Sequence, residues 1–268
     1  ISSSLPFGEG ENGGGEELMK LGLVFSGGGV RALAHAGLLK ALEEKGLRPS
    51  IISGTSGGAL IGALYACGVK PDDMMRFFKE TPLFKWSMIT FKKVGLVDSA
   101  KYAKFFKKEL QYHTFEELQL PLIVTATNLL NGKLQYFSKG ELIQPIIASA
   151  ALPPYFSPVR IGESLYCDGG LLDNFPIEPI KKQCDKIIGS FVNPLETITE
   201  KELSNSFQFM QRIYNITMDG SYSRKFKKCD LLLLHNLSNI GVLDTKMLDH
   251  AFEYGYEMGI KRLAELKD

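Results

Sequence analysis

The sequence lacks the features that mark several large classes of protein. No apolar run approaches the about 20 residues that a transmembrane helix needs. Lysine and arginine (31) almost balance aspartate and glutamate (30), so the formal net charge of +1 gives no overall field that would attract nucleic acid. No histidine, cysteine or acidic residues cluster at metal-ligand spacing, so we expect neither a metal nor a cofactor.

Cysteine is scarce as well. The four cysteines, Cys67, Cys167, Cys184 and Cys229, form no C-x-x-C pair and have no zinc-site spacing. They are typical of reduced, mostly buried residues in an intracellular protein. The sequence also shows no basic segment followed by the apolar core of a signal peptide. We therefore expect a cytoplasmic protein, with any membrane contact restricted to the surface.

The first 18 residues differ from the rest of the chain. They are rich in Ser, Gly and Glu and have no periodic apolar pattern, so we expect them to be disordered. Our hypothesis is that residues 1–18 derive from a cloning vector and that the native chain begins at or near Met19. Residues 19–268 contain neither an internal repeat nor a linker and are expected to form one domain.

Strand and helix patterns alternate along residues 19–268, which is typical of an α/β fold. Short apolar runs predict strands over 21–25, 47–53, 122–127, 133–138, 159–161, 164–167, 186–192 and 229–235, the last a buried strand with four consecutive leucines. Periodic apolar positions predict helices over 32–45, 58–67, 71–79, 99–110, 142–151, 176–183, 201–221 and 247–266. We expect a single-domain, three-layer sandwich with a mainly parallel central sheet.

A G-x-S-x-G turn lies between a predicted strand and a predicted buried helix. The turn is Gly54-Thr55-Ser56-Gly57-Gly58, with the serine at its apex. Strand, tight turn and helix form the context of a nucleophile elbow, in which flanking glycines permit a strained backbone around an exposed hydroxyl. The amides at the helix start, beginning with that of Gly57, favour a developing negative charge. The alternative is a plain turn between two buried elements.

A second glycine run, Gly27-Gly28-Gly29, ends the first strand. Its backbone N–H groups can converge on an anion, so beside a serine nucleophile it predicts an oxyanion hole. Arg31 follows at the helix start, either to orient the loop or to contact a phosphate, or simply as a solvated residue. The run also fits G-x-G-x-x-A through Ala32, but the next strand ends without the acid that a dinucleotide site requires.

Ser56 needs a base, and the sequence offers two. Asp168-Gly169-Gly170 follows a predicted hairpin, and desolvation would raise the Asp168 pKa above the usual value of about 3.9 and make it a better base. His235 follows a predicted strand, so a Ser56–Asp168–His235 triad stays open.

The other histidines are not expected to be catalytic. His113 and His250 are predicted to be structural or solvated, whereas His35 lies on the Arg31 face of its helix and is expected to help position the glycine loop.

Residues 81–97 combine aromatic and apolar side chains with interspersed lysines. The segment contains Trp86, the sole tryptophan, together with Phe91. We interpret it as a cap over the site that faces lipid, with ordinary core packing as the alternative.

Taken together, these stretches resemble the patatin-like phospholipase family, most of all its short bacterial members related to the neuropathy target esterase domain. Gly27–Arg31 resembles the family's oxyanion loop, Gly54–Gly58 its elbow, and Asp168-Gly169-Gly170 its D-G-G/A motif. Residues 148–156 also resemble the helix and loop upstream of that aspartate. The order is correct across most of residues 20–195, although Ala32 stands where the family often has glycine.

The resemblance implies a patatin-like fold and a dyad without a catalytic histidine. Ser56 would be the nucleophile and Asp168 the base, and the reaction would be hydrolysis of a lipid carboxylic ester through an acyl-enzyme. A lipid or another acyl ester is the implied partner. The alternatives are an esterase with the His235 triad and a non-catalytic protein that binds lipid or a protein partner.

Overall fold

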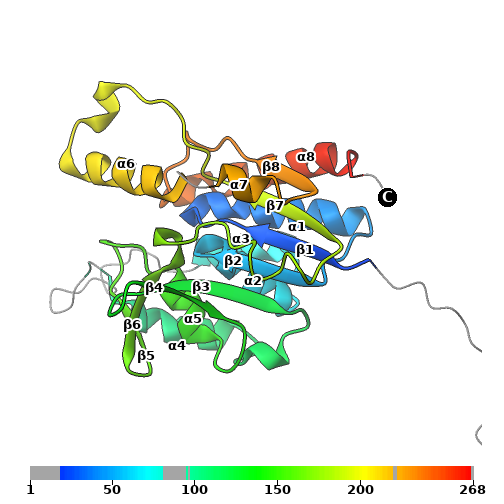
Figure 1. The fold of residues 1–268 in the computed structure, drawn as a ribbon, viewed down its shortest axis with the longest axis horizontal. Coiled ribbons are helices and arrows are strands. Elements are labelled where there is room, and N and C mark those ends of the chain that lie inside the picture. The colour runs from blue at the N-terminus through cyan, green and yellow to red at the C-terminus, as the bar shows by residue number, and fades with distance from the viewer. Residues whose placement is uncertain (1–18, 81–94, 96, 220–221, 267–268) are drawn as a thin grey trace, which may run out of the picture.

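An eight-stranded mixed sheet runs through the molecule, and the computed structural model describes residues 19–80, 95, 97–219 and 222–266 (Figure 1). The strands are β1 (Leu21–Phe25), β2 (Ile51–Thr55), β3 (Leu122–Asn128), β4 (Lys133–Phe137), β5 (Val159–Ile161), β6 (Ser164–Asp168), β7 (Lys186–Phe191) and β8 (Leu231–Leu234). The expected disordered segment 1–18 and nearly all of the expected cap at 81–97 lie outside the described residues.

Five strands form a parallel block in the order β3-β2-β1-β7-β8. β4 and β6 both pair antiparallel with β3, and β5 extends the sheet beyond β6. The expected α/β architecture with a mainly parallel sheet is therefore confirmed. In such a sheet, ligands bind beyond the carboxyl ends of the parallel strands.

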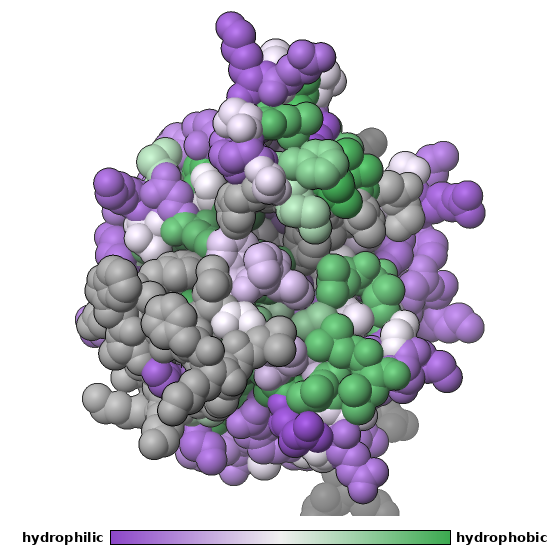
Figure 2. Space-filling view, turned by 90° about the vertical axis from the view of Figure 1, so that its left-hand side faces the viewer, coloured by the Kyte–Doolittle hydropathy of each residue, from purple (hydrophilic) through white to green (hydrophobic). Residues whose placement is uncertain are grey.

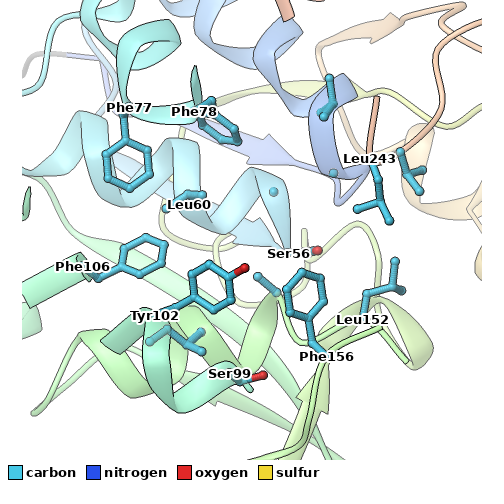
Figure 3. A pocket seen from close by; sticks show the side chains of 16 residues that line it. Ser56, Leu60, Phe77, Phe78, Ser99, Tyr102, Phe106, Leu152, Phe156 and Leu243 are labelled. Carbon is cyan, nitrogen blue, oxygen red and sulfur yellow. The ribbon is translucent and has the colours of Figure 1, made fainter. Parts of the chain in front are cut away.

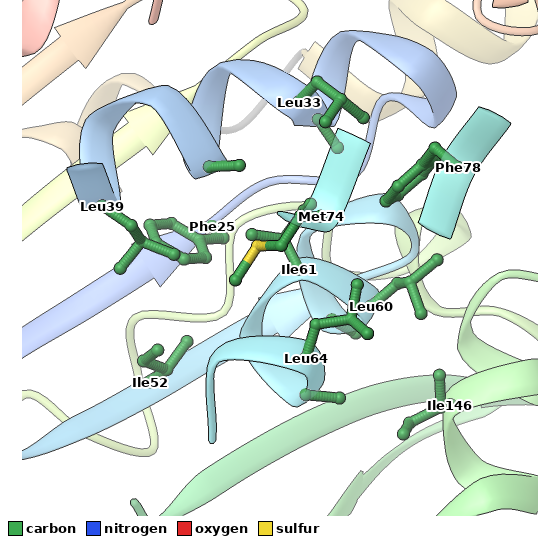
Figure 4. Close-up of a cluster of buried hydrophobic side chains, with 14 of the residues drawn as sticks. Phe25, Leu33, Leu39, Ile52, Leu60, Ile61, Leu64, Met74, Phe78 and Ile146 are labelled. Atoms are coloured by element: carbon green, nitrogen blue, oxygen red, sulfur yellow. The ribbon is translucent and has the colours of Figure 1, made fainter. Parts of the chain in front are cut away.

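One face of the sheet is covered by α1 (Leu33–Glu44), α2 (Gly57–Ala66), α3 (Pro71–Glu80), α4 (Ser99–Glu109), α5 (Ile143–Ser149) and α8 (Leu248–Leu263). Two other helices, α6 (Ser206–Asp219) and α7 (Ser223–Phe226), lie elsewhere. Alternation along β1 separates two cores, because Leu23 and Phe25 join the helical core whereas Val24 joins a smaller cluster on the opposite face. Figure 4 shows α2 in the middle of the larger core, whose side chains include Ile61 of α2 and Met74 of α3.

The opposite face is covered by turns and by the short helix α7, not by long helices. The helix predicted over 176–183 is wrong, since this segment forms consecutive turns. Pro179 has no backbone N–H to donate, and the N–H groups of Ile180 and Lys181 both reach back to the carbonyl of Ile177. Phe175 and Ile177 nevertheless cover the sheet as a third layer would.

Two further predictions need correction. The long helix expected over 201–221 is divided into a 3₁₀ turn, Glu200–Leu203, and α6, which begins at Ser206. β8 is the outermost strand on its side, and Leu234 is 43% exposed, so the leucine run is only partly buried. None of the described helices is long and apolar enough to cross a membrane.

Helices α1 and α8 pack with their backbones nearly in contact. A Cβ atom at Gly255 of α8 would lie 2.1 Å from the carbonyl oxygen of Ala34, and one at Gly37 of α1 would lie 2.1 Å from that of Phe252. Only glycine allows this approach, which holds α1 against α8 and so fixes the helix that follows the glycine loop.

We expect Gly255→Ala to lower the free energy of unfolding by about 1–3 kcal/mol, because the added methyl group must push the two helices apart. Urea denaturation followed by circular dichroism measures the change. The control is Glu257→Ala, an exposed position on the same helix, for which we expect a change within about 0.5 kcal/mol. Equal effects of the two substitutions would contradict the close contact.

Candidate active site

Ser56 occupies a strained turn between the end of β2 and the start of α2. Its backbone has φ 52° and ψ −123°, and no other non-glycine residue of the described chain has a positive φ. The residues two positions before and after it must be glycine, because a Cβ at Gly54 would lie 2.8 Å from the Ala59 nitrogen and one at Gly58 2.5 Å from the Ser26 carbonyl oxygen. Strain of this kind is typical of a functional residue held in place by its surroundings.

Asp168 is the direct hydrogen-bond partner of Ser56. The Ser56 hydroxyl donates to Asp168 Oδ2 over 2.7 Å, and the Gly170 N–H donates to Asp168 Oδ1, also over 2.7 Å. Both carboxylate oxygens are thus engaged. Ser56 is buried, and Asp168 is only 1% exposed.

Burial changes the acidity of Asp168. Loss of solvent around the carboxylate raises its pKa to about 7, although the hydrogen bonds from Ser56 and Gly170 favour the charged form and offset part of this rise. A carboxylate with this pKa accepts a proton from a hydroxyl far more readily than an ordinary aspartate does, and it remains largely ionised just above neutral pH.

The backbone of Asp168 is fixed by the sheet. It ends β6 opposite Ala126 of β3, its N–H donates to the carbonyl of Ala151, and the Thr127 hydroxyl donates to its carbonyl over 2.9 Å. Gly169 follows so closely that a Cβ there would lie 2.3 Å from Thr125 Oγ1. The D-G-G sequence therefore places the carboxylate at a set position beside the elbow.

The glycine loop lies against the elbow, but its three glycines are not equivalent. The Gly27 N–H donates to Asn174 Oδ1 over 2.9 Å, and Asn193 Nδ2 donates to the Gly27 carbonyl over 2.6 Å. Gly27 therefore cannot supply an oxyanion donor, contrary to expectation, and it serves instead to anchor the loop. Within the part of the chain that the structure describes, the N–H groups of Gly28 and Gly29 have no protein acceptor.

Gly29 and Gly57 bring the loop and α2 into contact. Gly29 has φ +57°, and a Cβ there would lie 1.9 Å from the Val242 carbonyl oxygen. A Cβ at Gly57 would lie 2.7 Å from the Cβ of Ala32 and 2.8 Å from the Gly29 carbonyl oxygen. Ala32, where the family often has glycine, fits because Gly57 has no side chain. No acceptor in the described chain meets the Gly57 N–H either.

Arg31 orients the loop through its side chain. Its Nε donates to the Ile240 carbonyl over 2.7 Å, and its Nη1 donates to Asn193 Oδ1 over 3.0 Å. Asn193 in turn holds Gly27. Burial lowers the pKa of the guanidinium, with Glu196 acting in the opposite direction. Of the roles predicted for Arg31, the contacts favour loop orientation.

Sequence reasoning missed three polar residues around the site: Asn174, Asn193 and Ser149, whose hydroxyl accepts the Ser56 N–H over 2.8 Å. Asn193 lies two residues beyond the carboxyl end of β7, a position that favours ligand and loop contacts and could have been noticed. Asn174, four residues beyond Gly170, and Ser149, on α5, gave no comparable signal.

His235 is part of a different hydrogen-bonded chain. His35 Nε2 lies 2.9 Å from the Ser26 carbonyl, which can only accept, so this nitrogen carries the proton. His35 Nδ1 then accepts from the Ser190 hydroxyl, and Ser190 Oγ accepts from His235 Nε2, each over 2.8 Å. His35 thus contacts the residue just before the glycine loop, in line with its expected positioning role.

Both buried histidines are neutral. Burial lowers the pKa of His35 to about 4 and that of His235, further reduced by the neighbouring His35, to about 3. His235 makes no hydrogen bond to Ser56 or Asp168. His113 and His250 are exposed, as expected.

Two cavities meet at Ser56. The smaller encloses about 100 Å³, and its described walls are almost wholly apolar, with Leu60, Phe77, Phe106 and Phe156 among them (Figure 3). The larger encloses about 540 Å³ and reaches Asp168 and Asn193. Gly29 borders both cavities. An apolar group and a bulkier, partly polar group can therefore both lie next to the serine.

Residues 23–181 match the family model described as patatin-like phospholipase. The chain belongs to this family. The matched range contains the glycine loop, the elbow and the D-G-G motif of the patatin-like site.

The chain is also similar to individual patatin-like relatives. Lysophospholipase nte1 of Aspergillus fumigatus is 28% identical over 281 residues, covering 92% of this chain and 18% of the relative. An uncharacterized NTE family protein of Mycobacterium tuberculosis is 30% identical over 169 residues, covering 62% of this chain and 47% of the relative. The chain therefore spans less than half the length of each.

The fold is shared with a solved structure. The crystal structure of VipD from Legionella pneumophila matches with a TM-score of 0.65 at 16% identity, over 92% of this chain and 67% of that one. This likeness concerns the fold, which is the patatin-like arrangement already inferred from the family match.

Asp168→Asn should stabilise the patatin-like fold above neutral pH. An unfolded Asp168 loses its proton near pH 3.8, whereas the folded residue keeps it to about pH 7, so the wild-type residue costs stability as the pH rises between these values. We expect a gain on the order of 2–4 kcal/mol at pH 8 and little at pH 3.5.

Urea denaturation at the two pH values measures this gain. Asp73→Asn, an exposed carboxylate on α3, is the control and should change stability by less than about 1 kcal/mol at either pH. A gain for Asp168→Asn that is the same at both pH values would contradict a buried carboxylate with a raised pKa.

Proposed function

We propose that this chain is a serine hydrolase that cleaves carboxylic esters of lipids, of the phospholipase or lysophospholipase type. The observation that carries the proposal is the 2.7 Å hydrogen bond from the Ser56 hydroxyl to buried Asp168, at the junction of two cavities. The family match and the relatives named as lysophospholipases support the substrate class.

The reaction begins with proton transfer from Ser56 to Asp168. Ser56 Oγ attacks the ester carbonyl carbon, and the carbonyl oxygen becomes an oxyanion that accepts hydrogen bonds from the backbone N–H groups of Gly28, Gly29 and Gly57. When the tetrahedral intermediate collapses, the leaving alcohol takes the proton from Asp168. A covalent acyl-Ser56 remains.

Hydrolysis of the acyl-enzyme repeats the same steps with water. Asp168 takes a proton from the water as the water oxygen attacks the acyl carbon, and the same N–H groups donate hydrogen bonds to the second oxyanion. Collapse returns the proton from Asp168 to Ser56 Oγ and releases the fatty acid. One carboxylate thus acts as base and then as acid in each half of the reaction.

The contacts of His235 favour the dyad over the triad. Its Nε2 is engaged with Ser190, and the two oxygens of Asp168 are engaged with Ser56 and Gly170, so no histidine lies between base and nucleophile. The pKa of about 7 gives Asp168 the basicity that a triad obtains from imidazole.

The two cavities suggest how a lipid binds. The apolar smaller cavity suits the acyl chain, and the larger one, which includes Asn193 and Asn215, suits the remainder of the molecule. We further propose that the enzyme works in the cytoplasm, since all four cysteines are free thiols. It would meet its substrate at the surface of a membrane or micelle.

A fluorophosphonate probe tests whether Ser56 is a nucleophile. We expect covalent labelling of the wild-type protein, none of Ser56→Ala, and a reduction of about 10³-fold or more in the labelling rate for Asp168→Asn. The rate should fall tenfold per pH unit below about pH 7 and level off above it, because only ionised Asp168 accepts the proton. A folded wild-type protein that stays unlabelled would support the non-catalytic alternative.

His235→Gln separates dyad from triad. The glutamine amide can still donate to Ser190, so we expect ester hydrolysis within about tenfold of wild type and an unchanged pH profile. Assays of kcat/KM on a short-chain ester measure this, with circular dichroism to establish folding. A loss of several thousand-fold in a folded variant would favour the triad, because triad members act as a unit.

A further inference from the structure

Helix α6 lies at the mouth of the larger cavity. Ser206, Met210 and Asn215 on this helix contribute to the cavity wall, together with Leu171 from the turn that follows Asp168. In Figure 1, α6 projects from the body of the fold on the side where the strands of the parallel block end. Any substrate that enters this cavity therefore passes next to α6.

The outer side of α6 is apolar and exposed to solvent. Phe209, Met210, Ile213 and Ile216 are exposed by 52%, 60%, 43% and 47%. Their spacing of one, four and seven residues from Phe209 places them along one face of the helix, and we call them the α6 stripe. Single exposed hydrophobic residues are common, but a continuous stripe on one helix marks an interaction surface.

More exposed apolar residues belong to other segments near the same end of the sheet. Leu129 and Leu130 follow the carboxyl end of β3, and Leu172 follows the 3₁₀ turn after Asp168. Figure 2 looks onto this end of the molecule and shows hydrophobic side chains gathered along its right-hand side. The exposed apolar surface at this end of the molecule therefore extends beyond α6.

The position of the stripe limits what can cover it. Met210 belongs both to the stripe and to the cavity wall, so the covered surface continues into the cavity. A protein seated on the stripe would obstruct the mouth through which substrate must enter. A lipid aggregate can cover the stripe and also deliver an acyl chain along it without exposing the chain to water.

We propose that the α6 stripe docks onto the surface of a lipid aggregate and guides the substrate from it into the larger cavity. This inference rests on the proposed lipid hydrolase function and names the surface that meets the lipid. None of the four stripe residues is charged, and nearby Arg212 donates to the Glu196 carbonyl over 2.8 Å. Burial of apolar surface therefore drives docking, which should depend little on salt and should not require anionic lipid.

The first experiment measures binding without catalysis. Ser56→Ala protein is sedimented with phosphatidylcholine vesicles, alone and in combination with Phe209→Gln/Ile213→Gln. We expect the double substitution to lower the partition coefficient at least about tenfold, because two large apolar side chains no longer enter the lipid. Leu234→Gln, an exposed leucine on β8, is the matched control and should leave binding within about twofold.

The second experiment measures catalysis on two physical forms of substrate. In otherwise wild-type protein, Phe209→Gln/Ile213→Gln should lower the rate on lysophosphatidylcholine micelles at least about tenfold and leave the rate on a monomeric short-chain ester within about twofold. Neither substituted residue is among those that line the two cavities at Ser56. Unchanged vesicle binding by the double variant, or equal losses on both substrates, would overturn the proposal.

The two proposals fail separately. A protein that binds vesicles through α6 but does not hydrolyse the monomeric ester would refute the hydrolase function and not the docking surface. A wild-type protein that is dimeric by analytical ultracentrifugation, and monomeric once Phe209 and Ile213 are replaced, would assign the stripe to a second copy of the chain and overturn lipid docking.

Discussion

The strained backbone of Ser56 is the constraint to which the surrounding structure conforms. A serine at positive φ persists only where its neighbours prevent relaxation, and here β2 and α2 are both buried and leave the turn no freedom. Because Gly54 and Gly58 approach other backbone atoms so closely, β2, α2 and the end of β1 can pack only in this arrangement. The elbow thus determines how the centre of the fold is packed as well as where the hydroxyl points.

The site combines opposing physical demands. Burial of a carboxylate costs free energy, yet the raised pKa of Asp168 depends on that burial. The hydrogen bonds from Ser56 and Gly170 favour the charged form and so keep the carboxylate ionisable. His35 and His235 are also buried, but both imidazoles are neutral. Each forms a hydrogen bond with Ser190 of β7. Buried ionisable groups therefore have two roles here, packing for the two histidines and, in the proposed mechanism, proton transfer for Asp168.

Local patterns predicted the framework well. The apolar runs of β1, β2, β3 and β7 and the glycine-bounded α1 are visible in the sequence because each is a continuous buried element. The helix predicted over 176–183 is wrong because the apolar pattern of this segment favours a helix, whereas Pro179 within it has no N–H to donate. Ser56, Asp168 and the loop glycines stood out through their spacing, but the distinction between Gly27 and its two neighbours depends on Asn174 and Asn193, which no local pattern connects to them.

The anchoring of Gly27 has a consequence for when the site is formed during folding. Its N–H and its carbonyl are held by asparagines that lie 147 and 166 residues further along the chain. A nascent chain that ends before β7 contains Ser56, Asp168 and Asn174 but lacks Asn193, so only the N–H of Gly27 can be held. The glycine loop is therefore fully anchored only after β7 and Asn193 have been synthesised, later than both Ser56 and Asp168.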